Sequence, residues 1–125
     1  MPLRPLPLLC LLAVLPERGD AHHSTAMYDP DELLDVSGIV ARVEWTGPHA
    51  FIFVTAADGP DGTVEWGIEL DPPVLLERLG WRESTVEAGD SITFTGAPAK
   101  SGAPTMRGLS AVLDDGTELA VWSSR

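Results

Sequence analysis

The chain has almost no cysteine. Its single cysteine, Cys10, lies in an apolar N-terminal segment that we expect to be removed on export, which leaves the mature protein without a thiol. Disulfides, thiolate metal sites and cysteine nucleophiles are then all excluded, although an exported protein is normally free to form disulfides. We therefore expect packing alone to stabilise the fold.

Basic residues are also few. The chain has 8 Lys and Arg against 19 Asp and Glu, which gives a net charge of −11. A negative field of this size repels phosphate backbones and anionic lipid headgroups, and it raises the local concentration of cations. We expect no nucleic-acid partner. The same charge also suits a soluble surface that binds nothing.

No apolar run is long enough to span a membrane permanently. The run over residues 6–15 is interrupted by Pro7 and ends before Pro16, whereas a spanning helix needs about 20 residues. It follows Arg4 and precedes a short polar segment, which is the pattern of an exported precursor. We expect residues 1–21 to be a cleaved signal peptide, and the protein to be periplasmic or secreted with no stable membrane insertion.

Familiar catalytic motifs are missing as well. The serines lack a nucleophile-elbow context, and no glycine-rich phosphate loop opens a helix. Glu65 and Glu69 share one face of a predicted strand but lie about 13 Å apart along it, too far to act as a carboxylate pair on one bond. We interpret both as part of a solvated face, and we expect no enzymatic activity.

What the chain does contain is the pattern of one small β-rich domain. Alternating apolar and polar residues predict six strands, over residues 36–45, 50–56, 64–70, 91–96, 106–113 and 119–122. Gly38 indicates a bend or bulge in the first strand. Between the third and fourth strands lies a helix signal, with Asp71 as its cap, Gly80 as its stop, and Trp81 folding back onto it.

This element order predicts an OB-fold, a five-stranded Greek-key barrel. We expect an all-β, OB-like barrel of five to six strands over residues 36–122, with its helix between strands 3 and 4. An extended N-terminal arm over residues 22–35 precedes it. The alternative is an open β-sandwich, in which the helix would only decorate a loop.

Five short motifs are spread along the chain. They are Ala21-His22-His23-Ser24, Glu44-Trp45-Thr46-Gly47-Pro48-His49, Glu65-Trp66-Gly67-Ile68-Glu69-Leu70, Leu79-Gly80-Trp81 and Ala88-Gly89-Asp90. Together they resemble a family of small exported bacterial proteins known only as a domain of unknown function. The resemblance covers nearly all of residues 21–119, and it implies mature chains that open on His-His-Ser and carry a Trp-Thr-Asn-Pro-His turn. This chain has Gly47 where the family has Asn.

The predicted barrel is also similar in architecture to a periplasmic copper chaperone of the Cus efflux system. That protein is a small OB-barrel that holds copper with His, Met and Trp. The similarity is one of fold, and a shared fold does not carry a function with it.

The candidate metal ligands are the three histidines, His22, His23 and His49. Cleavage after Ala21 would give His22 a free amine beside its imidazole, a bidentate chelate that His49 can complete as a nitrogen set suited to Cu(II). Cleavage after Asp20 would instead let the Ala21 amine, two backbone nitrogens and the His23 imidazole surround Cu(II) or Ni(II). We expect the affinity for the metal ion to fall as the pH is lowered, because only deprotonated donors bind.

Further candidate ligands and an alternative function come from the same regions. Softer or weaker ligands are available at Met27, Tyr28 and Met106, although packing is the ordinary role of methionine. Trp45, Thr46, Pro48 and Met27 are candidates for the lining of a binding groove. The leading hypothesis is an exported, monomeric protein that carries or buffers a transition-metal ion, and the ion we expect is copper. The alternative is a periplasmic protein- or glycan-binding adaptor that binds no metal.

Overall fold

The computed structural model describes residues 2–3 and 26–123. Along the chain lie β1 (Leu34–Glu44), β2 (Phe51–Asp58), β3 (Gly62–Glu69), α2 (Pro73–Arg78), β4 (Ser91–Pro98), β5 (Thr105–Leu113) and β6 (Glu118–Ala120). Except for Pro2 and Leu3, the predicted signal peptide lies outside the described residues, and so do His22 and His23. In the described part of the chain, no helix has the length and hydropathy of a membrane span.

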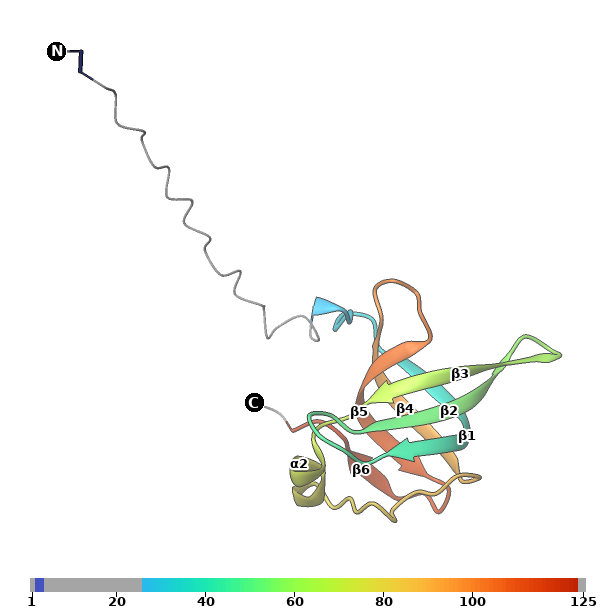
Figure 1. Cartoon of the computed structure of the whole chain (residues 1–125). Helices are drawn as coiled ribbons and strands as arrows, with labels where there is room; N and C mark the ends of the chain where they lie inside the picture. Colours follow the sequence, from blue (N-terminus) through green and yellow to red (C-terminus); the bar gives the residue numbers. More distant parts are fainter. Residues whose placement is uncertain (1, 4–25, 124–125) are drawn as a thin grey trace.

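The strands form a closed barrel (Figure 1). Their order in the sheet is β3-β2-β1-β4-β5-β6, and an additional pairing of β3 with β5 closes the ring of five, with β6 as an extra strand on β5. The closing pairing is parallel and short, running from Gly67 opposite Thr105 to Glu69 opposite Arg107. The predicted OB-like barrel, with its helix between strands 3 and 4, is confirmed.

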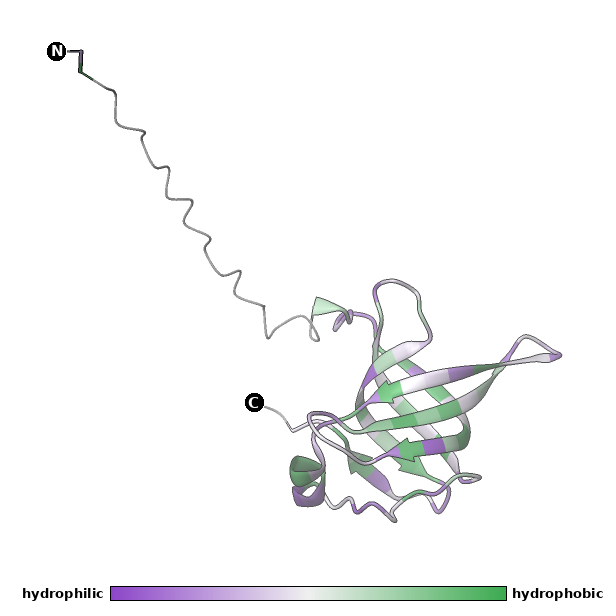
Figure 2. Cartoon of the chain, viewed as in Figure 1, coloured by the Kyte–Doolittle hydropathy of each residue, from purple (hydrophilic) through white to green (hydrophobic). Residues whose placement is uncertain are grey.

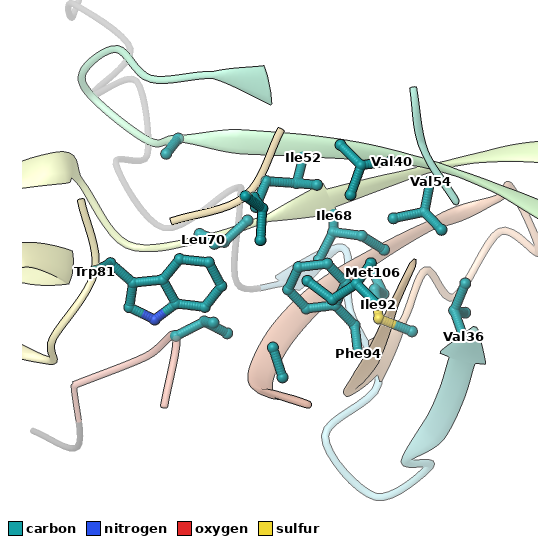
Figure 3. Close-up of a cluster of buried hydrophobic side chains, with 14 of the residues drawn as sticks. Val36, Val40, Ile52, Val54, Ile68, Leu70, Trp81, Ile92, Phe94 and Met106 are labelled. Atoms are coloured by element: carbon teal, nitrogen blue, oxygen red, sulfur yellow. The ribbon is translucent and has the colours of Figure 1, made fainter. Parts of the chain in front are cut away.

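The core fills the barrel with the inward-facing residues of every long strand (Figure 3). The largest fully buried side chains include Ile52, Ile68, Phe94 and Met106. Alternation of hydrophobic and hydrophilic residues along the strands follows from this one-sided burial (Figure 2). Burying each large apolar side chain is worth roughly 1.5–3 kcal/mol, so the barrel interior supplies most of the favourable free energy of folding.

Of the predicted bend or bulge at Gly38, the bulge lies elsewhere in β1. The register shift of β1 against β2 lies between Val40 and Arg42, not at Gly38. Gly38 instead pairs with both Ala56 of β2 and Ile92 of β4, and a Cβ at this position would overlap the Thr55 carbonyl oxygen. Glycine is required here because two backbones approach closely.

The start of helix α2 also corrects the prediction, while its end confirms it. The N-cap residue is Pro72, with no side-chain cap, so the prediction that Asp71 caps the helix is wrong. After the helix, Gly80 has a φ of +100°, and the Trp81 amide donates to the Leu76 carbonyl at 2.9 Å. The buried Trp81 indole then donates to the Ala120 carbonyl at 2.8 Å and ties the helix to β6.

The described part of the arm, residues 26–33, runs along the outside of the barrel beside the loop between β4 and β5 (Figure 1). Tyr28 forms an isolated β-bridge with Ala99, and the Lys100 amide donates to the Met27 carbonyl at 2.8 Å. Tyr28, Ala97 and Ala99 make a second, small apolar cluster. The arm is therefore attached to the barrel by both backbone and side-chain contacts.

Candidate functional site

Glu69, the last residue of β3, lies at the centre of a polar cluster on the outer face of the barrel. Its neighbour Ile68 points into the core, and Glu69 is paired with Arg107 across the parallel seam. Paired residues of adjacent strands present their side chains on the same face. The prediction that Glu69 belongs to a solvated face is wrong, because other segments cover this end of β3 and leave the residue only 5% exposed.

Three side chains converge on the Glu69 carboxylate. The Tyr28 hydroxyl donates to Oε2 at 2.7 Å. His49 Nδ1 lies 3.0 Å from Oε1, and Arg107 Nη1 lies 3.7 Å from the same oxygen. One carboxylate thus joins the arm, the β1–β2 loop and β5.

Asp71 and Arg107 extend the cluster towards the C-terminal segment. Asp71 is fully buried, and Arg107 Nη2 donates to its Oδ1 at 2.9 Å. The backbone amide and the hydroxyl of Ser123 both donate to Asp71 Oδ2 at 2.8 Å. These bonds offset the cost of burying a carboxylate, which is destabilising unless it is paired and hydrogen-bonded.

An aromatic ring completes the surroundings of His49. The Trp122 indole stacks on the imidazole with ring centroids 6.4 Å apart and planes 28° apart, and the Arg107 guanidinium lies over the same indole. The His49 side chain remains 29% exposed. Glu69 Oε1 lies 3.0 Å from Nδ1, so a neutral imidazole that carries its proton on Nδ1 would present the lone pair of Nε2.

Tyr28 is held in its neutral form. Burial raises the pKa of its hydroxyl well above the ordinary value, and the hydrogen bond to Glu69 raises it further. Tyr28 is thus a hydrogen-bond donor to Glu69, not an anionic ligand.

The other predicted site residues lie in several places. Met106 is in the barrel core, and Met27 is 54% exposed on the arm. Thr46 and Pro48 are exposed in the β1–β2 loop, where the Gly47–Pro48 peptide is cis. Within residues 2–3 and 26–123, no three His, Cys, Asp or Glu side chains form a group suited to a metal ion.

Trp45 is half-buried, and it lies beside α2 and the segment that follows α2. It packs against the core and borders an open depression of about 500 Å³, whose other lining residues are Glu77, Trp81, Arg82 and Glu83. Met27, the other end of the predicted groove, has its backbone paired with Lys100 in the β4–β5 loop. The contacts of these two groove residues are therefore with different segments.

Sequence reasoning missed Asp71, Arg107 and Trp122 as members of this cluster. The signal available was slight: Asp71 precedes two prolines and was interpreted as a helix cap, and Arg107 occupies an ordinary strand position. Their association depends on the parallel seam and on the C-terminal segment, which join residues 36 and 52 positions apart.

A family of unknown function (DUF6152) matches residues 11–109, which is most of the chain. The matched range contains Tyr28, His49, Glu69 and Arg107, whereas Trp122 lies beyond it. There is no match among curated proteins.

Proposed function

The chain belongs to this family of unknown function, and we propose that it is an exported binding protein that carries or buffers a transition-metal ion, copper, with no catalytic activity of its own. His49 binds the ion together with His22 or His23 and the new N-terminal amine. The observation that carries the proposal is that Glu69 contacts both His49 Nδ1 and the Tyr28 hydroxyl.

The Glu69–His49 pair supports the proposal through the chemistry of imidazole ligands. Metal-binding histidines commonly donate their second N–H to a carboxylate, which fixes the ring and makes the free nitrogen a better donor. Glu69 Oε1 lies 3.0 Å from His49 Nδ1, the position that such a carboxylate would occupy, and the His49 side chain is partly exposed. Imidazole nitrogens suit Cu(II), so the donor chemistry fits the proposed ion.

The Tyr28–Glu69 hydrogen bond supports the proposal because it limits the distance between the N-terminal histidines and His49. His22 and His23 precede Tyr28 by six and five residues. An extended chain of six residues spans at most about 20 Å, so the attachment of Tyr28 limits how far the N-terminal histidines can lie from Glu69 and His49. The net charge of −11 also favours the approach of a cation.

The test is calorimetric titration of Cu(II) into the chain that begins at His22, with its N-terminus verified by mass spectrometry. We expect a dissociation constant below about 1 μM, which corresponds to about −8 kcal/mol. His22→Ala and His49→Ala should each weaken binding strongly, because each removes a nitrogen donor. Tight binding that survives His49→Ala, or no binding by the correctly processed chain, would contradict the proposal.

A matched pair of carboxylate variants tests the role of Glu69. Glu69→Gln should weaken Cu(II) binding by roughly 10- to 100-fold, the usual cost of losing a carboxylate that orients a ligand. Glu65→Gln, on the same face of the same strand, should leave affinity unchanged, because Glu65 is exposed and pairs with Arg42 at 2.7 Å. Equal effects of the two variants on Cu(II) affinity would contradict the proposal that Glu69 orients His49.

The alternative, an adaptor for a periplasmic protein or glycan, has one observation in its favour. Trp45 borders an open depression of about 500 Å³ beside Trp81 and Arg82. For such an adaptor, binding would be lost in Trp45→Ala and would be indifferent to chelators. The metal carrier would show the opposite behaviour in both respects.

A further inference from the structure

A second binding feature lies beside the Glu69 cluster. It is an apolar pocket of about 260 Å³ on the outside of the barrel, with walls from the arm, β4, β5 and the C-terminal segment. Its lining residues are Tyr28, Pro30, Ala97, Arg107, Leu109 and Trp122. Small-molecule sites usually measure about 300–1,000 Å³, so this pocket suits a single apolar side chain better than a whole ligand.

The arm residues on either side of Pro30 in the sequence are acidic. Pro30 lies in a turn in which the Asp31 amide donates to Asp29 Oδ1 at 3.0 Å. Asp31 and Glu32 are exposed, and Asp29 is partly buried, so three carboxylates flank the arm's contribution to the pocket. Lys100 is exposed on the neighbouring loop, but the guanidinium inside the pocket is already paired with Asp71 and Glu69.

We propose that this pocket is a docking site for a protein partner, and that it receives one large apolar side chain from a basic segment. Interface energy is concentrated where an apolar side chain fills a pocket at the centre of a polar rim. The carboxylates of the arm select a basic segment by charge complementarity, which raises the association rate and disfavours acidic partners. Docking needs no metal, although the pocket shares Tyr28, Arg107 and Trp122 with the cluster around Glu69 and His49.

The probe is a capped pentapeptide with leucine between two lysines on each side, titrated into the chain and followed by backbone amide NMR shifts. We expect the shifts to concentrate on residues 28–32, Leu109 and Trp122. Replacing the central leucine with alanine should weaken binding roughly tenfold or more, because the apolar side chain is lost. Replacing the lysines with glutamates should abolish measurable binding, and added salt should weaken the lysine peptide.

A matched pair of strand variants locates the site. Leu109→Lys places a charge in the pocket and should abolish binding, whereas Val112→Lys, at an exposed position of the same strand that borders a different depression, should not. If Leu109→Lys does not fold, the double variant Asp31→Asn, Glu32→Gln should reduce affinity several-fold while leaving the apolar lining intact. The series is repeated in His22→Ala, where docking should persist even if metal binding is lost, because the variant changes none of the residues that line the pocket.

Several outcomes would overturn the proposal. The first is affinity that is the same for lysine and glutamate peptides, or unchanged in Leu109→Lys. A second is a dimer in sedimentation analysis that dissociates in Leu109→Lys, which would assign the pocket to another copy of this chain. A third is a nuclear Overhauser contact in the free protein between Leu109 and residues outside 26–123, which would assign it to the chain's own termini.

Discussion

Glu69 illustrates how a charged residue at an outward strand position becomes part of a buried site. Its carboxylate is close to donors from Tyr28, His49 and Arg107, which come from three separate segments. A carboxylate removed from water is tolerated only when such donors replace the water. Loss of its charge would remove one acidic partner of Arg107 and leave the pair of Arg107 with Asp71 in place.

Glu69→Gln should destabilise the fold by about 1–3 kcal/mol, because a buried ion pair is broken on one side only. Glu65→Gln is the control, and it should cost less than about 0.5 kcal/mol, since exposed ion pairs contribute little. Chemical denaturation of both variants measures the difference. Equal stabilities would show that the pairs around Glu69 contribute no more than a surface pair.

The ionisation of Tyr28 can be followed directly by absorbance, because the chain has a single tyrosine. Its pKa is raised by burial and by the hydrogen bond to Glu69, so the hydroxyl stays neutral where an exposed tyrosine ionises, near pH 10. The stabilising contribution is complete below about pH 10 and is lost as pH rises through the raised pKa. The phenolate absorbance should therefore appear at a higher pH in the folded chain than in denaturant. Titration curves that coincide for the folded and the denatured chain would refute the burial of Tyr28.

At this scale the sequence predicts which face a residue occupies better than whether that face is covered. The alternation of β3 correctly places Ile68 inward and Glu69 outward. The groups that approach the Glu69 carboxylate come from Tyr28, 41 residues away, and from His49 and Arg107. Local periodicity contains no information on such distant contacts, so the polar cluster could not be found from the pattern alone.

At the scale of elements, β1 is shared between two neighbouring strands along its length. It pairs with β2 through one part of its length and with β4 through another, with Gly38 and Ile39 paired to both. Where the two halves of a strand pair with different neighbours, the backbones approach closely at the changeover, and a residue without a side chain fits there. Gly38 is that residue.

Gly38→Ala should destabilise the protein by about 1–3 kcal/mol or more, the cost of overpacking, because its Cβ would overlap Thr55 backbone atoms. Gly67→Ala is the matched control in β3, where the nearest atoms to the added Cβ lie 3.5 and 3.6 Å away, at ordinary contact distance. Thermal unfolding of the two variants distinguishes them. A Gly67→Ala variant that is equally destabilised would point to strand propensity rather than close approach.

The order and type of elements were predictable because each has a local cause. Strand alternation, the prolines at the start of α2 and the left-handed Gly80 at its end all act within a few residues. The function of Asp71 was not predictable in this way. An aspartate before Pro-Pro has the local signature of a cap, but Arg107 and Ser123 bind its carboxylate instead.

For the whole molecule, the excess of negative charge is the dominant electrostatic property. A net charge of −11 on 125 residues destabilises the compact state through repulsion among exposed carboxylates. The buried pairs around Arg107 are screened much less by salt than those exposed charges. The two populations therefore respond differently to ionic strength.

Adding sodium chloride at moderate concentration should raise the melting temperature. Screening that contributes about 1 kcal/mol would correspond to roughly 4–8 °C for a domain of this size. Calorimetry at several ionic strengths measures the effect, and chloride salts of several monovalent cations control for specific cation binding. A melting temperature that falls as salt is added would mean that favourable ion pairs outweigh the repulsion.

The seam between β3 and β5 has a consequence for maturation. Three residue pairs join these strands, and the last of them is Glu69 with Arg107. The Glu69–Arg107 pair can therefore form only when the ring of strands has closed, after β5 has folded back beside β3. A chain in which β5 has not yet joined β3 would lack the Arg107 and Leu109 walls of the pocket, so the proposed docking would be confined to closed barrels.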